Sequence, residues 1–430
     1  MPVPRRRVLQ LAAGAIGAGT LGALAGCSSS CPDSDAPAPE ERVSIRDSPT
    51  NPLPSPPTGS WPTSHGNPGR TGYAPGSLPE SIPSVRWRTT LDVPTTDPGS
   101  LSTSAPVVGD GLVVVADSRH VHALSATSGE IEWVSEPIGV TLYDTLHEYE
   151  ANTASPALGP GGNVYVPTAD GIVALDGGDG SIRWTVDGMT DVAAPAVVDG
   201  TVYALGAGDL RALTRSGEER WTRPVPRGAK PIPPAAGDSS VIAVTERGVR
   251  GYDATSGDER WSVDRRARSY PVLGEGTCYV GSDVGLHALD AATGEERWTF
   301  SRGDYRALLT PVLTEDTIYV VEQPGEAGAA SFALERTGSK PEPRWCSYIG
   351  SGAVTAATAG HVLAILSLGE GPDAAQGIVA FTKDFGRVQW AIEGGSRPRN
   401  WVTPPAVVDG TVVLTTRGGT VVTVGGPADA

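Results

Sequence analysis

His120 and His122 are the residues whose types and spacing come closest to a metal-binding pair. They lie two positions apart in the stretch HVHAL, and alternation along a β-strand would place both side chains on one face. Neutral imidazole is a common ligand of zinc and copper. Related stretches of the chain hold other residues at the position of His122, namely Val173, Arg211, Arg250, His287 and Val379. A position that accepts such different side chains is typical of a partly exposed strand, so the sequence favours no metal ion here.

The four cysteines are a second source of chemistry, but their spacing does not fix their pairing. Cys278 falls in an apolar stretch, and Cys346 follows a tryptophan in the next unit of the chain. A disulfide between them is permitted in an exported protein, provided that their Cβ atoms approach to about 4.5 Å. Two unpaired, partly buried thiols are an equally good interpretation.

Other catalytic patterns are missing from the sequence. It contains no glycine-rich phosphate loop, no Ser/His/Asp arrangement and no cysteine and histidine cluster with metal-binding spacing. The frequent Asp-Gly and Gly-Asp pairs indicate turns and lack the strict EF-hand spacing. We therefore expect no catalytic, cofactor-binding or metal-binding residues.

The charge of the chain excludes one large class of partner. The 430 residues carry a formal net charge of −16, and an acidic surface repels the phosphates of nucleic acids. The basic residues are nearly all arginine, and the lysines are Lys230, Lys340 and Lys383. An acidic, lysine-poor protein suits a high-salt organism, and a GC-rich genome would account for the arginines equally well.

The first 26 residues have the features of an export signal. PRRRVLQ supplies adjacent arginines that resemble the twin-arginine (Tat) motif, and the apolar stretch after it is too short and glycine-rich to be a good membrane span. It ends in LAGC, which resembles the lipobox of lipoproteins, so we expect lipid attachment at Cys27. Residues 27–60, rich in proline, serine and acidic residues, are interpreted as a lipidated tether. The folded domain would be extracytoplasmic, and acyl chains alone would anchor it to the cell membrane.

A repeated phrase organises the rest of the chain. Its copies, complete or altered, are ALDAATGEERW (288–298), GYDATSGDERW (251–261), ALDGGDGSIRW (174–184), ALSATSGEIEW (123–133), ALTRSGEERW (212–221) and AFTKDFGRVQW (380–390). A glycine four residues before each tryptophan suits a tight hairpin that needs positive φ. The tryptophan can fill the gap between one sheet and the next. The predicted docking tryptophans are Trp87, Trp133, Trp184, Trp221, Trp261, Trp298, Trp345 and Trp390.

The spacing of these tryptophans predicts the fold. It averages about 43 residues, the size of a four-stranded propeller blade. Triplets of apolar strands begin near residues 104, 155, 194, 233, 270, 310, 354 and 403. The last triplet lacks a tryptophan strand, whereas SVRWRTTL (84–91) lacks a preceding triplet. We therefore predict an all-β, eight-bladed β-propeller of four-stranded blades over residues 61–425, with a tail at 426–430. Its N-terminal strand would complete the last blade and close the ring.

The repeated phrase, together with WPTSHGNPGRTGYAP (61–75), resembles the PQQ-like repeat of quinoprotein alcohol dehydrogenase-like propellers. The resemblance implies one of two functions. Quinoprotein dehydrogenases oxidise alcohols or sugars with pyrroloquinoline quinone (PQQ) and Ca²⁺, and they often carry two adjacent cysteines, which this chain lacks. Lipoproteins of the BamB family are noncatalytic scaffolds in outer-membrane protein assembly, and they match this chain in size, lipid anchor and blade number.

The longest predicted loops suggest where a partner would bind. Insertions at 135–154, 322–331, 367–377 and 391–402 all follow strands that end on the same predicted face. They carry Tyr143, Tyr149, Arg397, Arg399 and Trp401, and these residue types are typical of interface anchors.

We therefore expect a noncatalytic, monomeric, membrane-anchored scaffold that binds an envelope or secreted protein, or a peptide, on this face. Two alternatives remain open at this stage. One is a PQQ- and Ca²⁺-dependent dehydrogenase with a divergent site, and the other is a sensor of a small ligand or glycan.

Overall fold

The computed structural model describes residues 42–94, 103–140, 142, 155–226, 232–267, 269–301, 308–322, 329–337, 341–350, 352–368, 375–384, 386–395 and 402–426. All of them belong to one compact unit, Cys31–Ala430. Every element among them is a β-strand. This part of the chain contains no apolar helix long enough to cross a membrane.

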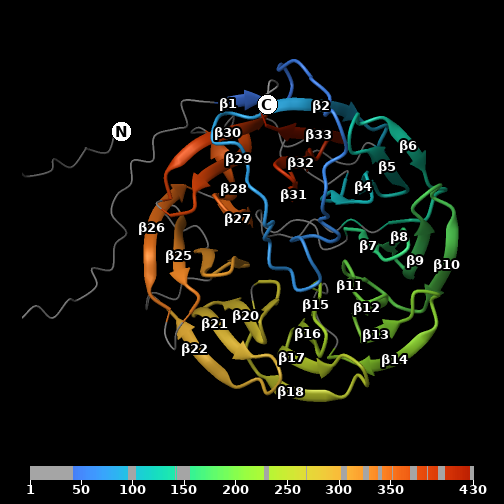
Figure 1. The fold of residues 1–430 in the computed structure, drawn as a ribbon. Helices are drawn as coiled ribbons and strands as arrows, with labels where there is room; N and C mark the ends of the chain where they lie inside the picture. Colours follow the sequence, from blue (N-terminus) through green and yellow to red (C-terminus); the bar gives the residue numbers. More distant parts are fainter. Residues whose placement is uncertain are drawn as a thin grey trace, which may run out of the picture. The chain divides into compact units, whose positions relative to one another are not determined.

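The strands form eight antiparallel blades arranged in a ring (Figure 1). The strands of blades 1 to 4 are, in chain order, β3 (Val107–Gly109), β4 (Leu112–Ala116), β5 (Val121–Ser125) and β6 (Ile131–Val134); β7 (Ala157–Gly159), β8 (Asn163–Pro167), β9 (Gly171–Asp176) and β10 (Ile182–Asp187); β11 (Ala196–Val198), β12 (Thr201–Leu205), β13 (Asp209–Leu213) and β14 (Glu219–Pro224); and β15 (Ala235–Ala236), β16 (Ser240–Thr245), β17 (Gly248–Asp253) and β18 (Glu259–Val263).

Blades 5 to 8 continue around the ring, and the last one combines both ends of the propeller. Their strands are β19 (Val272–Gly274), β20 (Thr277–Ser282), β21 (Gly285–Asp290) and β22 (Glu296–Phe300); β23 (Val312–Leu313), β24 (Thr317–Val321), β25 (Ala329–Glu335) and β26 (Pro343–Gly350); β27 (Gly352–Ala357), β28 (His361–Leu368), β29 (Ala375–Thr382) and β30 (Val388–Gly395); and β31 (Ala406–Val408), β32 (Thr411–Thr415), β33 (Thr420–Gly425) and β2 (Ser84–Thr90).

Burial follows the position of a strand within its blade. The second strands β8 and β12 are buried at every residue, because neighbouring blades cover both of their faces. The outermost strand β10 is exposed or half-buried at every residue. Continuous apolar runs in the inner strands and polar alternation in the outer one therefore follow from the same packing.

The ring closes as the sequence predicts. Strand β2 pairs with β33 in antiparallel register, from Ser84 opposite Gly425 to Thr90 opposite Thr420. Trp87 of β2 is buried, and its indole N–H donates to the carbonyl of Ala126 in blade 1 at 2.9 Å. The eight-bladed fold and the pairing of the two ends are both confirmed.

Blade 7 carries a strand that the sequence analysis did not foresee. Strand β1 (Arg42–Ser44) pairs in parallel with β30, and the side chain of Ile45 just after it is buried. Farther along, Asn51 donates its backbone N–H to Val85, and Thr58 donates to the carboxylate of Asp409. Residues 42–60 fall within the range expected to be a tether, and in the structure they run along blades 7 and 8 and reach blade 1, where Leu53 donates its N–H to Thr127.

Six of the eight docking tryptophans lie against the next blade, over the glycine of its last hairpin, whereas Trp390 donates its indole N–H to the carbonyl of Pro79 at 3.0 Å. Trp133 of β6 donates its indole N–H to Gly177 at 2.8 Å, and its ring covers Gly180 so closely that a Cβ there would lie 2.4 Å from it. The same arrangement pairs Trp87 with Gly129, Trp184 with Gly217, Trp221 with Gly257, Trp261 with Gly294 and Trp345 with Gly386. The repeated phrase thus joins blades.

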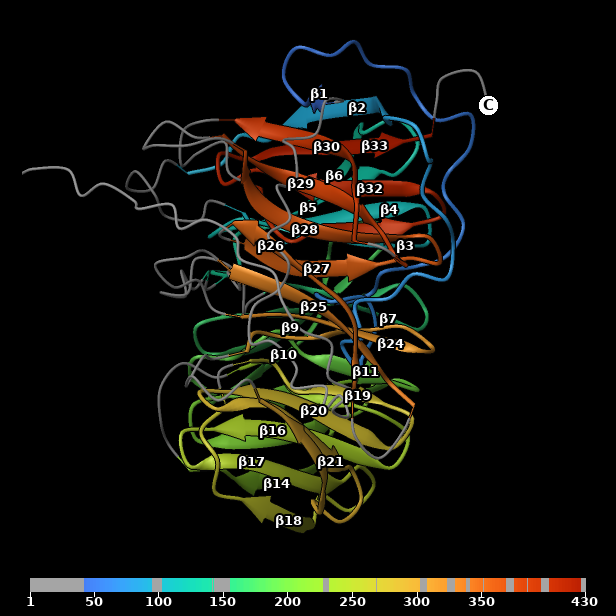
Figure 2. The same ribbon diagram turned by 90° about the vertical axis from the view of Figure 1, so that its left-hand side faces the viewer.

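The segment from Trp61 to Gly76 runs around the inside of the ring, visible as the blue trace inside it in Figure 1. Trp61 exchanges two backbone hydrogen bonds with Val108 of β3. Further backbone bonds join Leu158 to Pro62, Ala236 to Pro68, Leu273 to Gly69, Leu313 to Thr71, Ala357 to Gly72 and Ala359 to Gly76. The segment therefore contacts the first strands of successive blades near one face, away from the second-to-third connections (Figure 2).

Candidate functional site

The interior of the ring holds a buried positive charge. Arg70, with φ of 59°, is fully buried and has no carboxylate partner among the described residues. Its guanidinium donates to the carbonyls of Pro234 and Ala194, each at 2.8 Å, and to the carbonyl and hydroxyl of Ser64 at 3.0 and 2.8 Å. Burial lowers the pKa of Arg70 to about 10, so the group stays protonated at neutral pH.

His65 lies close to this charge and is neutral. Burial, followed by repulsion from Arg70, lowers the pKa of His65 to about 3. Its ring stands edge-on to Tyr270, with ring centroids 5.1 Å apart. The segment therefore places one cation inside the ring, held by backbone oxygens of blades 3 and 4.

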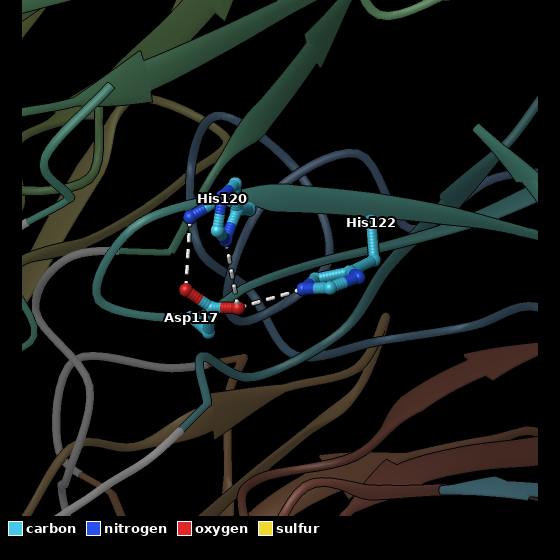
Figure 3. Close-up of side chains that lie close together, drawn as sticks. All are labelled: Asp117, His120 and His122. Atoms are coloured by element: carbon cyan, nitrogen blue, oxygen red, sulfur yellow. Dashed lines mark hydrogen bonds and ion pairs between the residues drawn. The ribbon is translucent and has the colours of Figure 1, made fainter. Parts of the chain in front are cut away.

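The donor groups that could hold a metal ion gather in blade 1 instead. Among the described residues, Asp117, His120 and His122 are the one group of three potential ligands whose donor atoms all lie within 4.8 Å of one another. Asp117 follows β4, His120 precedes β5, and His122 lies within β5, opposite Val115 of β4. The second-to-third connection of the blade is thus a tight turn that brings the three together (Figure 3).

Backbone hydrogen bonds fix the carboxylate of Asp117. Its Oδ1 accepts from the N–H groups of Arg119 and His120, at 2.5 and 2.8 Å, and its own N–H donates to the carbonyl of His120 at 2.9 Å. Its Oδ2 faces both imidazoles, 2.7 Å from Nε2 of His122 and 3.6 Å from Nδ1 of His120. Burial alone would raise the pKa of Asp117, but the hydrogen bonds from His122 and from the two backbone groups lower it overall.

The two histidines differ in their surroundings. The side chain of His122 is 6% exposed and that of His120 is 28% exposed, so one edge of the group reaches solvent. Nδ1 of His122 is buried and has no hydrogen-bond partner. The sequence singled out both histidines by their spacing but missed Asp117, whose Asp-Ser sequence is that of an ordinary turn.

Blade 5 shows the same positions without the carboxylate. The ladder of β20 and β21 places His287 opposite Val280, as His122 lies opposite Val115. There Ser282 occupies the place of Asp117, and its hydroxyl lies 2.7 Å from Nε2 of His287. Gly285 stands where His120 stands in blade 1, so blade 5 offers one imidazole where blade 1 offers two imidazoles and a carboxylate.

Two of the four cysteines, Cys278 and Cys346, lie in the described part of the chain. Cys278 is a free thiol and fully buried, and burial raises its pKa. Cys346 belongs to a disulfide. These two residues are therefore not bonded to each other. Of the two unpaired thiols in the alternative interpretation, Cys278 is confirmed and Cys346 is wrong.

The residues expected to bind a partner or a lipid fall outside the described part of the chain. These are Cys27, Tyr143, Tyr149, Arg397, Arg399 and Trp401. The strands that flank the longer insertions are described, and each insertion joins strands as expected. The stretch 323–328 lies between β24 and β25, and 369–374 lies between β28 and β29.

Two hollows lie between neighbouring blades. One, of about 310 Å³, is lined by residues of blades 1 and 2, including Glu132 and Trp133. The other, of about 370 Å³, lies between blades 4 and 5 beside Asn67. Neither lining contains a histidine or a cysteine, whereas the turn at Asp117 brings two histidines and a carboxylate together.

Comparison with protein families identifies the repeat. The family model described as outer membrane protein assembly factor BamB matches residues 83–206 and 206–340. The chain belongs to the BamB family. A comparison with curated protein sequences found no significant match.

Solved structures share the fold of this BamB family member at low identity. BamB from Moraxella catarrhalis is 16% identical with a TM-score of 0.55, covering 79% of this chain and 97% of its own. The quinohemoprotein alcohol dehydrogenase ADHIIG from Pseudomonas putida HK5 is also 16% identical, with a TM-score of 0.59, covering 86% and 81%. The computationally designed Ika8 protein is 13% identical with a TM-score of 0.60, covering 77% and 98%.

The residues of this BamB family member do not fit a quinone and Ca²⁺ site inside the ring. Calcium takes six to eight oxygen ligands, carboxylates among them. Among the described residues, no three carboxylates come together as such a ligand set, and the segment inside the ring presents the guanidinium of Arg70, which would repel a second cation. The sequence also has no adjacent cysteines.

Proposed function

We propose that this protein is a noncatalytic scaffold of the BamB family, held outside the cytoplasmic membrane by lipid at Cys27. It binds an envelope or secreted protein, or a peptide from one, on the face formed by the second-to-third and blade-to-blade connections. The protein functions as a monomer.

The contrast between the two faces carries this proposal. On one face the described hairpins repeat the same structure, with a glycine under a tryptophan of the preceding blade. On the other face the connections differ in length from blade to blade. The link between β12 and β13 spans only 206–208, whereas 369–374 separate β28 from β29. Variable loops on a rigid, repetitive frame are the usual location of binding function.

Two further observations support a scaffold over an enzyme. The family match covers more than half of the chain, and the interior of the ring is occupied by the segment around Arg70. Binding energy would come from residues of the long connections, for which we propose Tyr143, Tyr149, Arg397, Arg399 and Trp401. Aromatic and arginine side chains contribute most of the affinity in such interfaces.

The test is site-specific crosslinking in the native host. A photo-crosslinking residue is placed at Tyr143 and, as a matched control, at Thr255, an exposed hairpin residue on the opposite face. We expect a discrete adduct with an envelope protein at position 143, weakened by Trp401→Ala and missing at position 255. Identical adducts at both positions, or none from folded and anchored protein, would refute the assignment of this face.

A further inference from the structure

We propose that Asp117, His120 and His122 form a binding site for a divalent transition metal ion, and that Zn²⁺ is the ion it takes. This inference is independent of the proposed scaffold function. It stands on the geometry of one turn in blade 1, compared with the equivalent turn in blade 5.

The spacing of the donor atoms suits zinc. Zinc sites use nitrogen and oxygen ligands at about 2.0–2.1 Å in a tetrahedral arrangement, so neighbouring ligand atoms lie about 3.3 Å apart. The Oδ2 atom of Asp117 is 2.7 Å from one imidazole nitrogen and 3.6 Å from the other. These two distances bracket the required value, and all three donor atoms lie within 4.8 Å of one another, so an ion would draw the side chains together.

The turn holds its ligands in place before any ion arrives. Two backbone N–H groups bind Oδ1 of Asp117 and leave Oδ2 directed at both histidines. The pairing of Ala116 with Val121 fixes the strand that carries His122. Hydrogen bonds of this kind to the second oxygen of a ligand carboxylate orient metal ligands in known sites.

The equivalent histidine of blade 5, His287, has different surroundings. Its Nε2 lies 2.7 Å from the hydroxyl of Ser282, and its Nδ1 contacts the hydroxyl of Thr299 and lies 3.4 Å from the carboxylate of Glu296. In blade 1 the carboxylate of Asp117 instead faces two imidazoles. Among the described residues, the blade 1 turn alone brings three donor groups of the kinds that zinc takes within reach of one another.

Access and coordination number follow from burial. Asp117 and His122 are buried, whereas His120 is partly exposed, so an ion enters from the side of His120. Three protein ligands leave one position of a tetrahedral ion for water or for a group from a partner. The connection that follows β6 begins beside this turn, since Ile138 donates its N–H to the carbonyl of Arg119 at 2.8 Å. Bound zinc would therefore stiffen the base of that connection.

The test is Zn²⁺ binding by the purified, tag-free folded chain after treatment with a chelator. Calorimetry should give one site per chain, and Co²⁺ in its place should give the visible absorption of a tetrahedral ion. His120→Ala removes a partly exposed ligand and should weaken binding at least tenfold, whereas Arg119→Ala, one residue away, should leave it unchanged.

Two results would overturn the proposal. One is wild-type protein that binds no Zn²⁺, and the other is equal binding by wild type and His120→Ala, which would locate the ion elsewhere. Asp117→Asn offers a second, independent variant. If it fails to fold, His120→Gln preserves the test, because its side chain keeps the volume but loses the imidazole.

Discussion

Substituting the hairpin glycine of blade 2 tests how the blades are joined. Gly180 has φ of +74°, and a Cβ at this residue would lie 2.4 Å from Cε3 of Trp133. Alanine at 180 must therefore adopt a disfavoured backbone conformation and also displace an indole that is 8% exposed and bonded to Gly177. Gly162 of the same blade provides a matched control, with φ of +69° and open space around its Cβ position.

The magnitude follows from these two effects. Left-handed backbone at an alanine costs about 1–2 kcal/mol, and a stiffer unfolded chain returns about 0.5 kcal/mol of that. Displacing Trp133 loses a hydrogen bond worth about 1 kcal/mol and, if about 50 Å² of apolar area is exposed, a further 1.3 kcal/mol or so. Gly180→Ala should thus lower the free energy of unfolding by about 3 kcal/mol, and Gly162→Ala by about 1 kcal/mol.

Urea unfolding followed by far-UV circular dichroism measures both changes. In a Trp133→Ala background the loss caused by Gly180→Ala should shrink to that of Gly162→Ala, because the indole is no longer there to be displaced. Equal destabilisation by the two glycine substitutions in the wild-type background would show that Trp133 moves aside without any loss of stability. The account of blade joining would then be wrong.

Three further predictions concern the interior. Arg70→Met should lower the free energy of unfolding by about 3 kcal/mol or more, since it leaves several buried carbonyls without donors. The control Arg266→Met, at an exposed residue, should change the free energy little. Thermal unfolding of both variants makes the comparison. Because the pKa of His65 is lowered to about 3 by burial and by Arg70, the unfolded chain binds the proton first as pH falls below 6.5. The free energy of unfolding should therefore fall by about 2 kcal/mol between pH 7 and pH 5 because of His65. His65→Asn, whose new side chain tolerates positive φ, should remove this pH-dependent loss, and urea titrations at several pH values measure it. The thiol of Cys278 is buried with a raised pKa, so mass spectrometry should find it unlabelled by iodoacetamide in native protein and labelled in urea.

Much of the fold could be predicted because its signal is local and repeated. The glycine and tryptophan of ALDAATGEERW lie four residues apart and recur in six blades, so blade number followed from counting. The unpaired strand at 84–91 and the incomplete triplet after 403 predicted the closure that β2 and β33 show. Strand β1 could not be predicted, because three residues give no periodicity and its partner β30 lies some 350 residues away.

The candidate metal site was likewise only partly predictable from the sequence. His120 and His122 share a short stretch, so their spacing was visible. Asp117 resembled a turn residue, and only the register of β4 with β5 shows that its carboxylate faces both rings. A comparison of the residues at the end of the second strands, where Asp117 of blade 1 corresponds to Ser282 of blade 5, would have singled out blade 1.

The path of the segment from Trp61 to Gly76 has a consequence for the order in which the protein folds. This segment and β2 precede all eight strand triplets in the chain, yet their partners extend to Gly425. Residues synthesised among the first therefore reach their native contacts only after the last blade exists, and contacts so distant in sequence make folding slow. Until then β33 remains an open edge able to pair with other chains. A chain shortened at either end should accordingly aggregate instead of forming a smaller propeller.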